Sequence, residues 1–311
     1  MVHRVIGQEH LSLASDSKPE SSLGRLDALL DWAPIAERLG RLHAGPKGEA
    51  AWPPLAMFKA LLLSIWYDLS DVKLAEALDD RSSFRRFCGF SSNEPTPERT
   101  AFVRFRRSLV KAELDRVLFE TITAQLKARS VTVKTGTIVD ATIIASASVQ
   151  DGEGRWVKHK NKPAVHGFKA HVGADADTAL VEEIAVTPAN THDGRAGPDA
   201  LPEMPGDVFA DSAYRGRHFG DAVRAKGGQP RIAATAMWGR DEAETLARLS
   251  AFNALIHHVR ARIEKIFGTW KRSYGLRRMR WRGLAKVSAQ VRLTAIAYNL
   301  KRGLALSQRP A

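Results

Sequence analysis

Two aspartates stand where the sequence otherwise predicts apolar strands. Asp140 interrupts the apolar run 137–144, and Asp211 follows the apolar run 207–210. We expect both runs to be strands that carry these acids at their ends. A carboxylate beside a sheet interior is costly unless it is paired or binds a cation. Each aspartate is therefore either an ion-pair or capping residue, or a ligand to a metal ion.

Glu264 is a third candidate, and its sequence surroundings are strongly basic. It is the only acid in residues 257–282, which contain nine Lys or Arg residues. An ion pair with a neighbouring arginine would explain it, and so would a metal ion held beside bound phosphates. Apolar residues recur around it at helical spacing. We therefore expect a long helix over 242–267 whose apolar stripe packs on a core.

Three carboxylates of this kind suit Mg²⁺ or Mn²⁺, because these cations prefer hard oxygen ligands. Such a set can hold two ions about 4 Å apart. One ion would lower the pKa of an attacking water or hydroxyl, and the other would stabilise the leaving oxygen of an in-line phosphoryl displacement. The sequence thus predicts a site with two divalent ions on Asp140, Asp211 and Glu264, surrounded by basic residues that hold a DNA backbone.

The overall charge independently indicates a polyanionic partner. The net charge is +13 and the isoelectric point about 10.1, which favours nucleic acid over an acidic membrane surface. The most apolar run, 55–66, contains Lys59 and is too short to span a bilayer. Cys88 is the single cysteine, which fits a reducing cytoplasm. No Walker pattern occurs, so no nucleotide cofactor is expected.

The pattern of elements predicts two domains between a flexible arm (1–22) and a short tail (304–311). Residues 23–130 are expected to form an all-α, helix-turn-helix-like DNA-binding domain, although a basic face exposed to solvent is the simpler alternative. Residues 131–303 alternate strands and helices and predict an α/β domain with a mixed five-stranded sheet. The candidate DNA contacts of the helical domain are Arg99, Arg104, Arg106 and Arg107.

The three acidic blocks resemble those of bacterial insertion-sequence transposases, which are DDE enzymes with a ribonuclease H-like catalytic core. The blocks are Val-Asp-Ala-Thr-Ile-Ile around Asp140, Ala-Asp-Ser-Ala-Tyr-Arg-Gly around Asp211, and the segment 260–271 around Glu264. The resemblance is greatest to the insertion-sequence-five family, whose last block reads Tyr, two residues, Arg, three residues, Glu, six residues, Lys. Arg260, Glu264 and Lys271 match this spacing, whereas His257 replaces the tyrosine.

The resemblance implies a cut-and-join reaction on double-stranded DNA. Water would attack a phosphodiester at each terminal inverted repeat, and the freed 3′-hydroxyl would then attack target DNA. The acids would hold the metal, while Arg260 and Lys271 would contact phosphates near the cut. A homodimer on DNA and a bacterial, nucleoid-associated location are also implied. Further candidate DNA contacts are Lys169, Arg277, Arg278 and Arg280.

Two other functions fit parts of the sequence. A catalytically silent regulator derived from a transposase would bind the same DNA without cutting it. A cellular nuclease would share the core chemistry but would leave the basic helical domain unexplained. The three acids favour the enzyme over the regulator.

Overall fold

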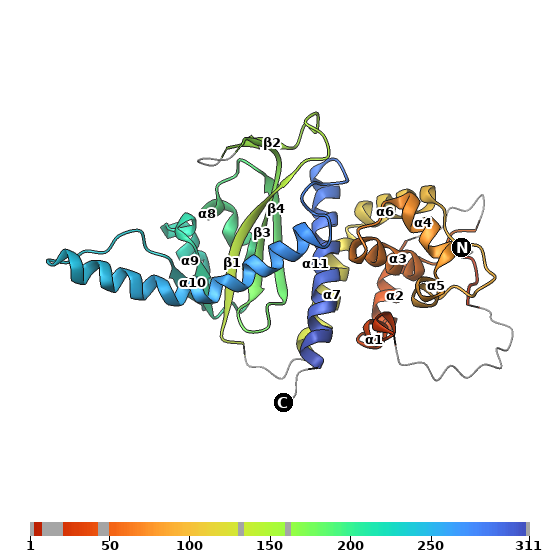
Figure 1. Ribbon diagram of the computed structural model, residues 1–311, viewed down its shortest axis with the longest axis horizontal. Helices are drawn as coiled ribbons and strands as arrows, with labels where there is room; N and C mark the ends of the chain where they lie inside the picture. The colour runs from red at the N-terminus through yellow and green to blue at the C-terminus, as the bar shows by residue number, and fades with distance from the viewer. Residues whose placement is uncertain (1–2, 8–20, 43–49, 130–133, 159–162, 309–311) are drawn as a thin grey trace. The chain divides into compact units, whose positions relative to one another are not determined.

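The computed structural model describes residues 3–7, 21–42, 50–129, 134–158 and 163–308. The chain divides into two compact units (Figure 1). One combines Met1–Ser130 with Arg292–Ala311, and the other is Val131–Val291. Among the described residues, no helix is long and apolar enough to cross a membrane.

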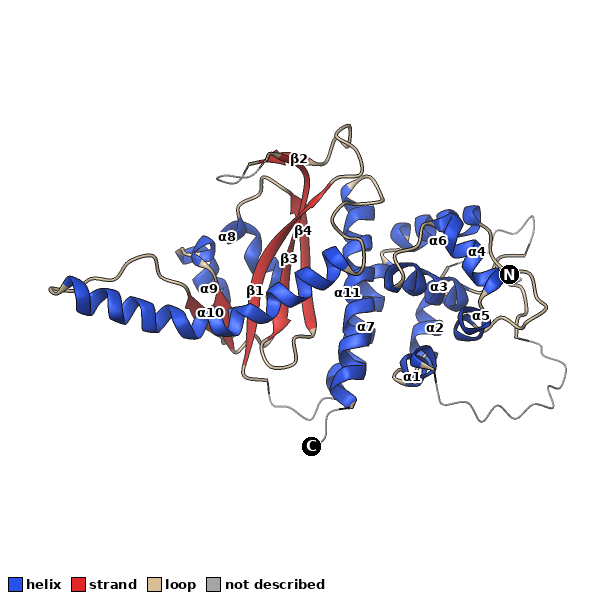
Figure 2. Cartoon of the chain, viewed as in Figure 1, coloured by secondary structure: helices blue, strands red, loops and turns tan. Residues whose placement is uncertain are grey.

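The first unit is built from helices (Figure 2). Every helix of this unit contributes buried leucine, isoleucine or phenylalanine, and α3 is buried on all sides. The helices are α1 (Ser22–Ala28), α2 (Ala33–Leu39), α3 (Pro54–Trp66), α4 (Asp71–Asp80), α5 (Ser82–Cys88), α6 (Arg99–Lys111), α7 (Leu114–Ala128) and the second half of α11 (Leu284–Ser307).

The end of α11 is held in this unit by polar contacts as well as apolar ones. The Trp66 indole donates to the Ala297 carbonyl at 2.8 Å, and Arg292 pairs with the buried Asp115 at 2.6 Å. The predicted catalytic domain ran to residue 303, but the contacts assign 292–311 to the helical unit. Helix α11 also continues to Ser307, into the predicted tail 304–311.

Most of the predicted arm, 1–22, lies outside the described residues. At its start, His3 forms a bridge with Ala51, and Arg4 donates its backbone N–H to the same residue. At its end, the Ser21 side chain caps α1. The described ends of this segment are therefore attached to the helical unit.

The second unit contains a mixed sheet. Strand β1 (Gly136–Ala145) pairs antiparallel with β3 (Val165–Asp175), which pairs antiparallel with β4 (Val181–Pro188). On its other side β1 pairs parallel with β5 (Asp207–Ala210), and β5 pairs parallel with β6 (Gln229–Ile232). The antiparallel strands β1, β3 and β4 and the parallel strands β1, β5 and β6 confirm the prediction of a mixed sheet.

Two details of the sheet differ from the prediction. A sixth strand, β2 (Arg155–Val157), pairs with the start of β3, whereas the sequence predicts five strands. This strand has only three residues, which are too few to show an alternating pattern. Asp140 lies in the middle of β1 instead of at a strand end, because the strand continues through the apolar residues beyond it to Ala145.

Helices cover both faces of this sheet. The long helix α10 (Glu242–Arg272) contacts β1 and β5, with Ile256 packed on Phe209 and Ala233. The other face is covered by α8 (Asp193–Ala196), the 3₁₀ helices η1 (Gly197–Ala200) and η2 (Ser212–Tyr214), and α9 (Arg217–Ala225). The apolar stripe of α10 thus fixes which of its polar residues face the sheet.

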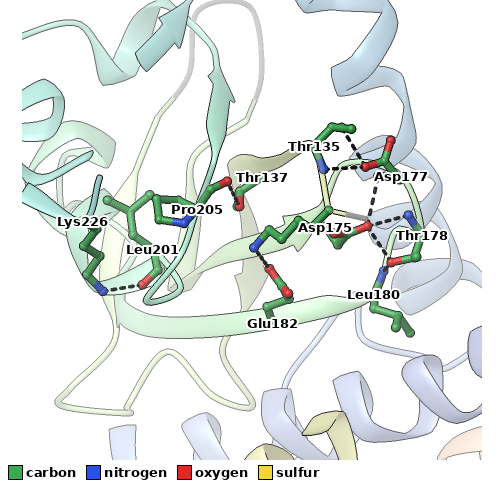
Figure 3. A network of polar contacts seen from close by, with 11 residues as sticks. Thr135, Thr137, Asp175, Asp177, Thr178, Leu180, Glu182, Leu201, Pro205 and Lys226 are labelled. Carbon is green, nitrogen blue, oxygen red and sulfur yellow. Dashed lines mark hydrogen bonds and ion pairs between the residues drawn. The ribbon is translucent and has the colours of Figure 1, made fainter. Parts of the chain in front are cut away.

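A network of polar contacts stabilises the end of the sheet at which the central strand β1 begins (Figure 3). Asp175 closes the turn between β3 and β4 by accepting from the Thr178 backbone at 2.6 Å. Asp177 accepts from the Thr135 backbone at 3.0 Å, and the Thr137 hydroxyl donates to the Pro205 carbonyl at 2.7 Å. These contacts hold the start of β1 beside the β3–β4 turn and the residues before β5.

The stripe of α10 predicts a contrast between two residues of the same helix. Ile263 is fully buried, so Ile263→Ala should lower the free energy of unfolding by about 2–5 kcal/mol. Leu255 is 62% exposed, so Leu255→Ala should change it by about 0.5 kcal/mol or less. Urea unfolding followed by circular dichroism measures both. Equal losses would contradict the packing of α10 on the sheet.

Candidate active site

Asp140 and Asp211 are brought together by two neighbouring strands. Asp140 projects from the middle of β1 toward α10, and its Oδ1 accepts from the Ala141 backbone at 2.7 Å. Asp211 directly follows β5 and caps η2, with its Oδ1 accepting from the Ala213 backbone at 2.9 Å. Each aspartate therefore has one oxygen committed to the backbone and one directed toward α10.

Those two remaining oxygens meet at a single nitrogen of Arg260. The Nη2 atom lies 2.9 Å from Asp140 Oδ2 and 3.8 Å from Asp211 Oδ2. The side chains of Asp140 and Arg260 are each 14% exposed, and that of Asp211 is 36% exposed. Asp140 and Arg260 thus lie largely out of water, whereas Asp211 is partly exposed, so the charge of Asp140 depends most on the nearby guanidinium.

The electrostatic state of Asp140 reflects this position. Its pKa is raised to about 6, mainly by burial and also by the negative charge of Asp211, while Arg260 and the Ala141 backbone N–H act in the opposite direction. Because burial outweighs the arginine, Asp140 takes up a proton at a higher pH than an exposed aspartate does.

Glu264 lies one helical turn after Arg260, on the same side of α10. It lines an open cleft of about 610 Å³ together with Asp140, Asp211 and Arg260. The other lining residues are Ala141, Thr142, Phe267, Gly268, Lys271, Arg272 and Arg277. The structure thus brings all three predicted acids to one cleft, whose walls are otherwise mainly basic and small.

The arrangement of the acids suits a divalent cation only in part. Asp140 and Asp211 already converge on one positively charged atom, and their oxygens are the donors that Mg²⁺ prefers. Across the described ranges of the chain, however, no three His, Cys, Asp or Glu residues are close enough together to hold a metal ion. The aspartate pair therefore fits a cation, whereas Glu264 shares the cleft without completing a three-carboxylate group.

Basic residues surround this cleft because the chain after α10 returns to β1. The Ala145 backbone donates to the Arg277 carbonyl at 3.2 Å, and Met279 donates to Ala145 at 2.7 Å. This pairing places Arg277 and Arg278 at the end of the strand that carries Asp140. Arg277, Arg278 and Arg280 are exposed, and Lys271 is half-buried in the cleft wall.

Lys169 does not fit the predicted contact with DNA. Its side chain is buried, and its ammonium donates to Asp193 at 2.8 Å and to the Thr191 carbonyl at 2.7 Å. The sequence prediction missed this because Asp193 follows β4 and reaches Lys169 only in the folded sheet. The neighbouring His171 is fully buried, and burial lowers its pKa to about 4.

The predicted arginines of the helical unit differ in their surroundings. Arg99, Arg104 and Arg107 are exposed on α6. Arg106 instead forms a two-armed ion pair with Asp71, at 2.5 and 2.6 Å, and is half-buried. That pair ties α6 to α4, so the guanidinium of Arg106 is already committed to a structural contact.

Tyr214 is a residue near the acids for which the sequence suggested no role. Its hydroxyl is buried and has no hydrogen-bond partner among the described residues. Burial raises its pKa, and the negative charges of Asp140, Asp193 and Asp211 add to that effect. The sequence could have indicated this position, because Tyr214 lies three residues after Asp211 in the block Ala-Asp-Ser-Ala-Tyr.

Comparison with known proteins finds two family models and one solved structure that resemble this chain. Residues 132–300 match a family model described as a transposase DDE domain, and residues 11–108 match a second model described as a transposase domain (DUF772). A cryo-EM structure of the piggyBac transposase synaptic complex with hairpin DNA is similar at a TM-score of 0.48 and 10% sequence identity. The similarity covers 90% of this chain and 74% of that one.

The first match spans more than half of the chain and includes Asp140, Asp211 and Glu264. The second falls on the part of the chain that forms α1 to α5 and most of α6. Both models describe transposases, and they follow one another along the sequence in the order of the two units. The protein therefore belongs to the DDE transposase family and is a DNA transposase.

Proposed function

We propose that Asp140, Asp211 and Glu264 form the catalytic site of this transposase and cut DNA with the help of Mg²⁺ or Mn²⁺. The observation that carries the proposal is the convergence of Asp140 and Asp211 on one cationic atom inside a basic cleft that Glu264 also lines. Carboxylate oxygens are the ligands that Mg²⁺ prefers, and two-metal phosphoryl-transfer sites hold their ions with carboxylates that lie close together.

Each side chain then has a distinct task. Asp140 and Asp211 would each offer the oxygen that now faces Arg260, because their other oxygens are fixed by backbone N–H groups. Glu264 would contribute from the opposite wall of the cleft. Two divalent ions, when bound, activate the attacking water or hydroxyl and stabilise the leaving oxygen of the phosphodiester.

The DNA backbone would lie along the basic wall of the cleft. Lys271 lines it, and Arg277, Arg278 and Arg280 follow on the segment joined to β1. Guanidinium groups hold phosphates with two parallel hydrogen bonds, which positions the strand as well as binding it. In the helical unit, Arg99, Arg104 and Arg107 are the exposed candidates for contact with terminal inverted repeats.

The finer classification rests on resemblance together with topology. An antiparallel three-strand meander followed by two parallel strands, with the first acid on the first strand, supports a ribonuclease H-like core. The spacing of Arg260, Glu264 and Lys271 supports the insertion-sequence-five family. We further propose that the enzyme acts as a homodimer that holds two transposon ends and that it works at the nucleoid of a bacterial cell.

The catalytic assignment predicts a separation of cutting from binding. Asp140→Asn, Asp211→Asn and Glu264→Gln should each lower Mg²⁺-dependent nicking of a terminal-repeat duplex by at least about a hundredfold, because each removes a charged oxygen ligand. Binding of the same duplex should change less than about threefold. Gel assays of nicking and binding on one labelled duplex measure both.

A suitable control is Asp199→Asn, which removes an exposed carboxylate from η1 on the other face of the sheet. This variant should nick normally. Normal nicking by Asp140→Asn would contradict the catalytic assignment. Loss of nicking in the control as well as in the three acid variants would show that the loss is not specific to the proposed catalytic acids.

The raised pKa of Asp140 predicts a pH dependence. Because its pKa is about 6 in the folded protein, the carboxyl takes up a proton as the pH falls through about 6, and the metal-binding oxygen is lost. Nicking should therefore decline below about pH 6. Since proton and metal compete for the same oxygen, a higher Mn²⁺ concentration should move the midpoint to lower pH.

Nicking rates from pH 5 to 8 at two Mn²⁺ concentrations measure this effect. A rate that is flat down to pH 5 at both concentrations would contradict this role for Asp140.

The same raised pKa also affects stability, because the folded protein binds an extra proton between about pH 4 and 6. The contribution of Asp140 to the free energy of unfolding therefore falls as the pH rises through that window.

A further inference from the structure

Arg260 occupies the position that a cation would take between the two aspartates. One nitrogen, Nη2, contacts both Asp140 at 2.9 Å and Asp211 at 3.8 Å. Two neighbouring carboxylates, of which Asp140 is largely buried and Asp211 partly exposed, repel unless a positive charge lies between them. In the described structure the guanidinium of Arg260 supplies that charge.

We propose that Arg260 is a displaceable counter-ion of the aspartate pair, and that a divalent metal ion and the Arg260 guanidinium compete directly for Asp140 and Asp211. The inference rests on the proposed metal site and adds a regulatory step to it. Binding of the metal releases Arg260 from the aspartates, and departure of Arg260 opens the oxygens to the metal.

The position of Glu264 agrees with this competition. Arg260 and Glu264 are one turn apart on α10, and both line the cleft that contains Asp140 and Asp211. While Arg260 contacts both aspartates, the described residues include no three-carboxylate group. Because Arg260 Nη2 contacts an oxygen of each aspartate, a metal ion that binds both of those oxygens must displace the guanidinium.

The released guanidinium has a destination in the cleft. Its Nε atom is buried and has no hydrogen-bond partner among the described residues, so its contact with the aspartates uses only part of its donor set. Arginine satisfies such donors most fully with phosphate oxygens, which accept two parallel hydrogen bonds. Lys271 and Arg277 line the same cleft and favour a phosphate there.

Competition of this kind links metal binding to DNA binding. A phosphate that draws Arg260 away frees the aspartates for metal, and a metal on the aspartates frees Arg260 for phosphate. By reciprocity, each ligand raises the affinity for the other. Without DNA, Arg260 holds the aspartates and metal binding is weak, so the cutting site is completed only on DNA.

The test uses the full-length protein without DNA and Mn²⁺ as the probe. Free Mn²⁺ is measured by electron paramagnetic resonance during titration of the wild type and of Arg260→Gln, which keeps a polar side chain but lacks the charge. We expect Arg260→Gln to bind Mn²⁺ about tenfold more tightly, within the usual range of coupling between competing groups.

The matched control is Arg277→Gln. It removes one positive charge from the lining of the same cleft without touching the aspartates. If general charge alone governed binding, both variants would tighten Mn²⁺ binding equally. Direct competition predicts about a twofold change or less for Arg277→Gln, so equal effects of the two variants would overturn the proposal.

A second variant and a second measurement test whether a change in Mn²⁺ binding arises from misfolding of Arg260→Gln. Arg260→Lys keeps the charge on a single nitrogen and should bind Mn²⁺ with intermediate affinity. Mn²⁺ should also raise the melting temperature of Arg260→Gln more than that of the wild type, because the unpaired aspartates gain the most from a cation. An equal rise in the two proteins would contradict the competition.

Adding Asp140→Asn separates this inference from the metal site on which it rests. If the wild type and Arg260→Gln bind Mn²⁺ equally and Asp140→Asn abolishes binding in both, the metal site stands and the competition is wrong. If Asp140→Asn leaves Mn²⁺ binding unchanged, the metal site itself is contradicted, and the inference falls with it.

Discussion

The burial of one stripe of α10 on the sheet determines what the site can do. Ile256, Ile263, Ile266 and Trp270 are buried, and each buried side chain of this size contributes about 1.5–3 kcal/mol relative to exposure. Because these residues recur at helical spacing, they also fix the rotation of the helix. Arg260 and Glu264 are thereby held over the strands that carry the two aspartates.

The position of α10 therefore determines which charged groups of the helix lie near the two aspartates of the sheet. The sheet supplies a largely buried carboxylate, Asp140, and a partly exposed one, Asp211, and the helix supplies one positive and one negative charge a turn apart. The raised pKa of Asp140 shows that one guanidinium does not fully offset the burial and the second aspartate. A site in this condition gains from an additional cation, which is the property that metal-dependent phosphoryl transfer needs.

Much of this could be predicted from the sequence because the strongest signals were local. The β-branched run around Asp140 gave strand β1, the periodic apolar residues gave α10, and the order of elements gave the antiparallel and parallel parts of the sheet. Strand β2 was not predicted, because its three residues are too few to show an alternating pattern. The burial of Lys169 and the pairing of Arg106 with Asp71 depend on partners distant in sequence, which periodicity does not reveal.

The central claim is that Asp140 and Asp211 hold a divalent metal in exchange for Arg260. Anomalous X-ray scattering from crystals of the protein with Mn²⁺ and terminal-repeat DNA tests it most directly. The account predicts a manganese peak about 2 Å from an oxygen of each aspartate, with the Arg260 guanidinium withdrawn from both. A crystal with manganese elsewhere, or with Arg260 still between the aspartates, would contradict it.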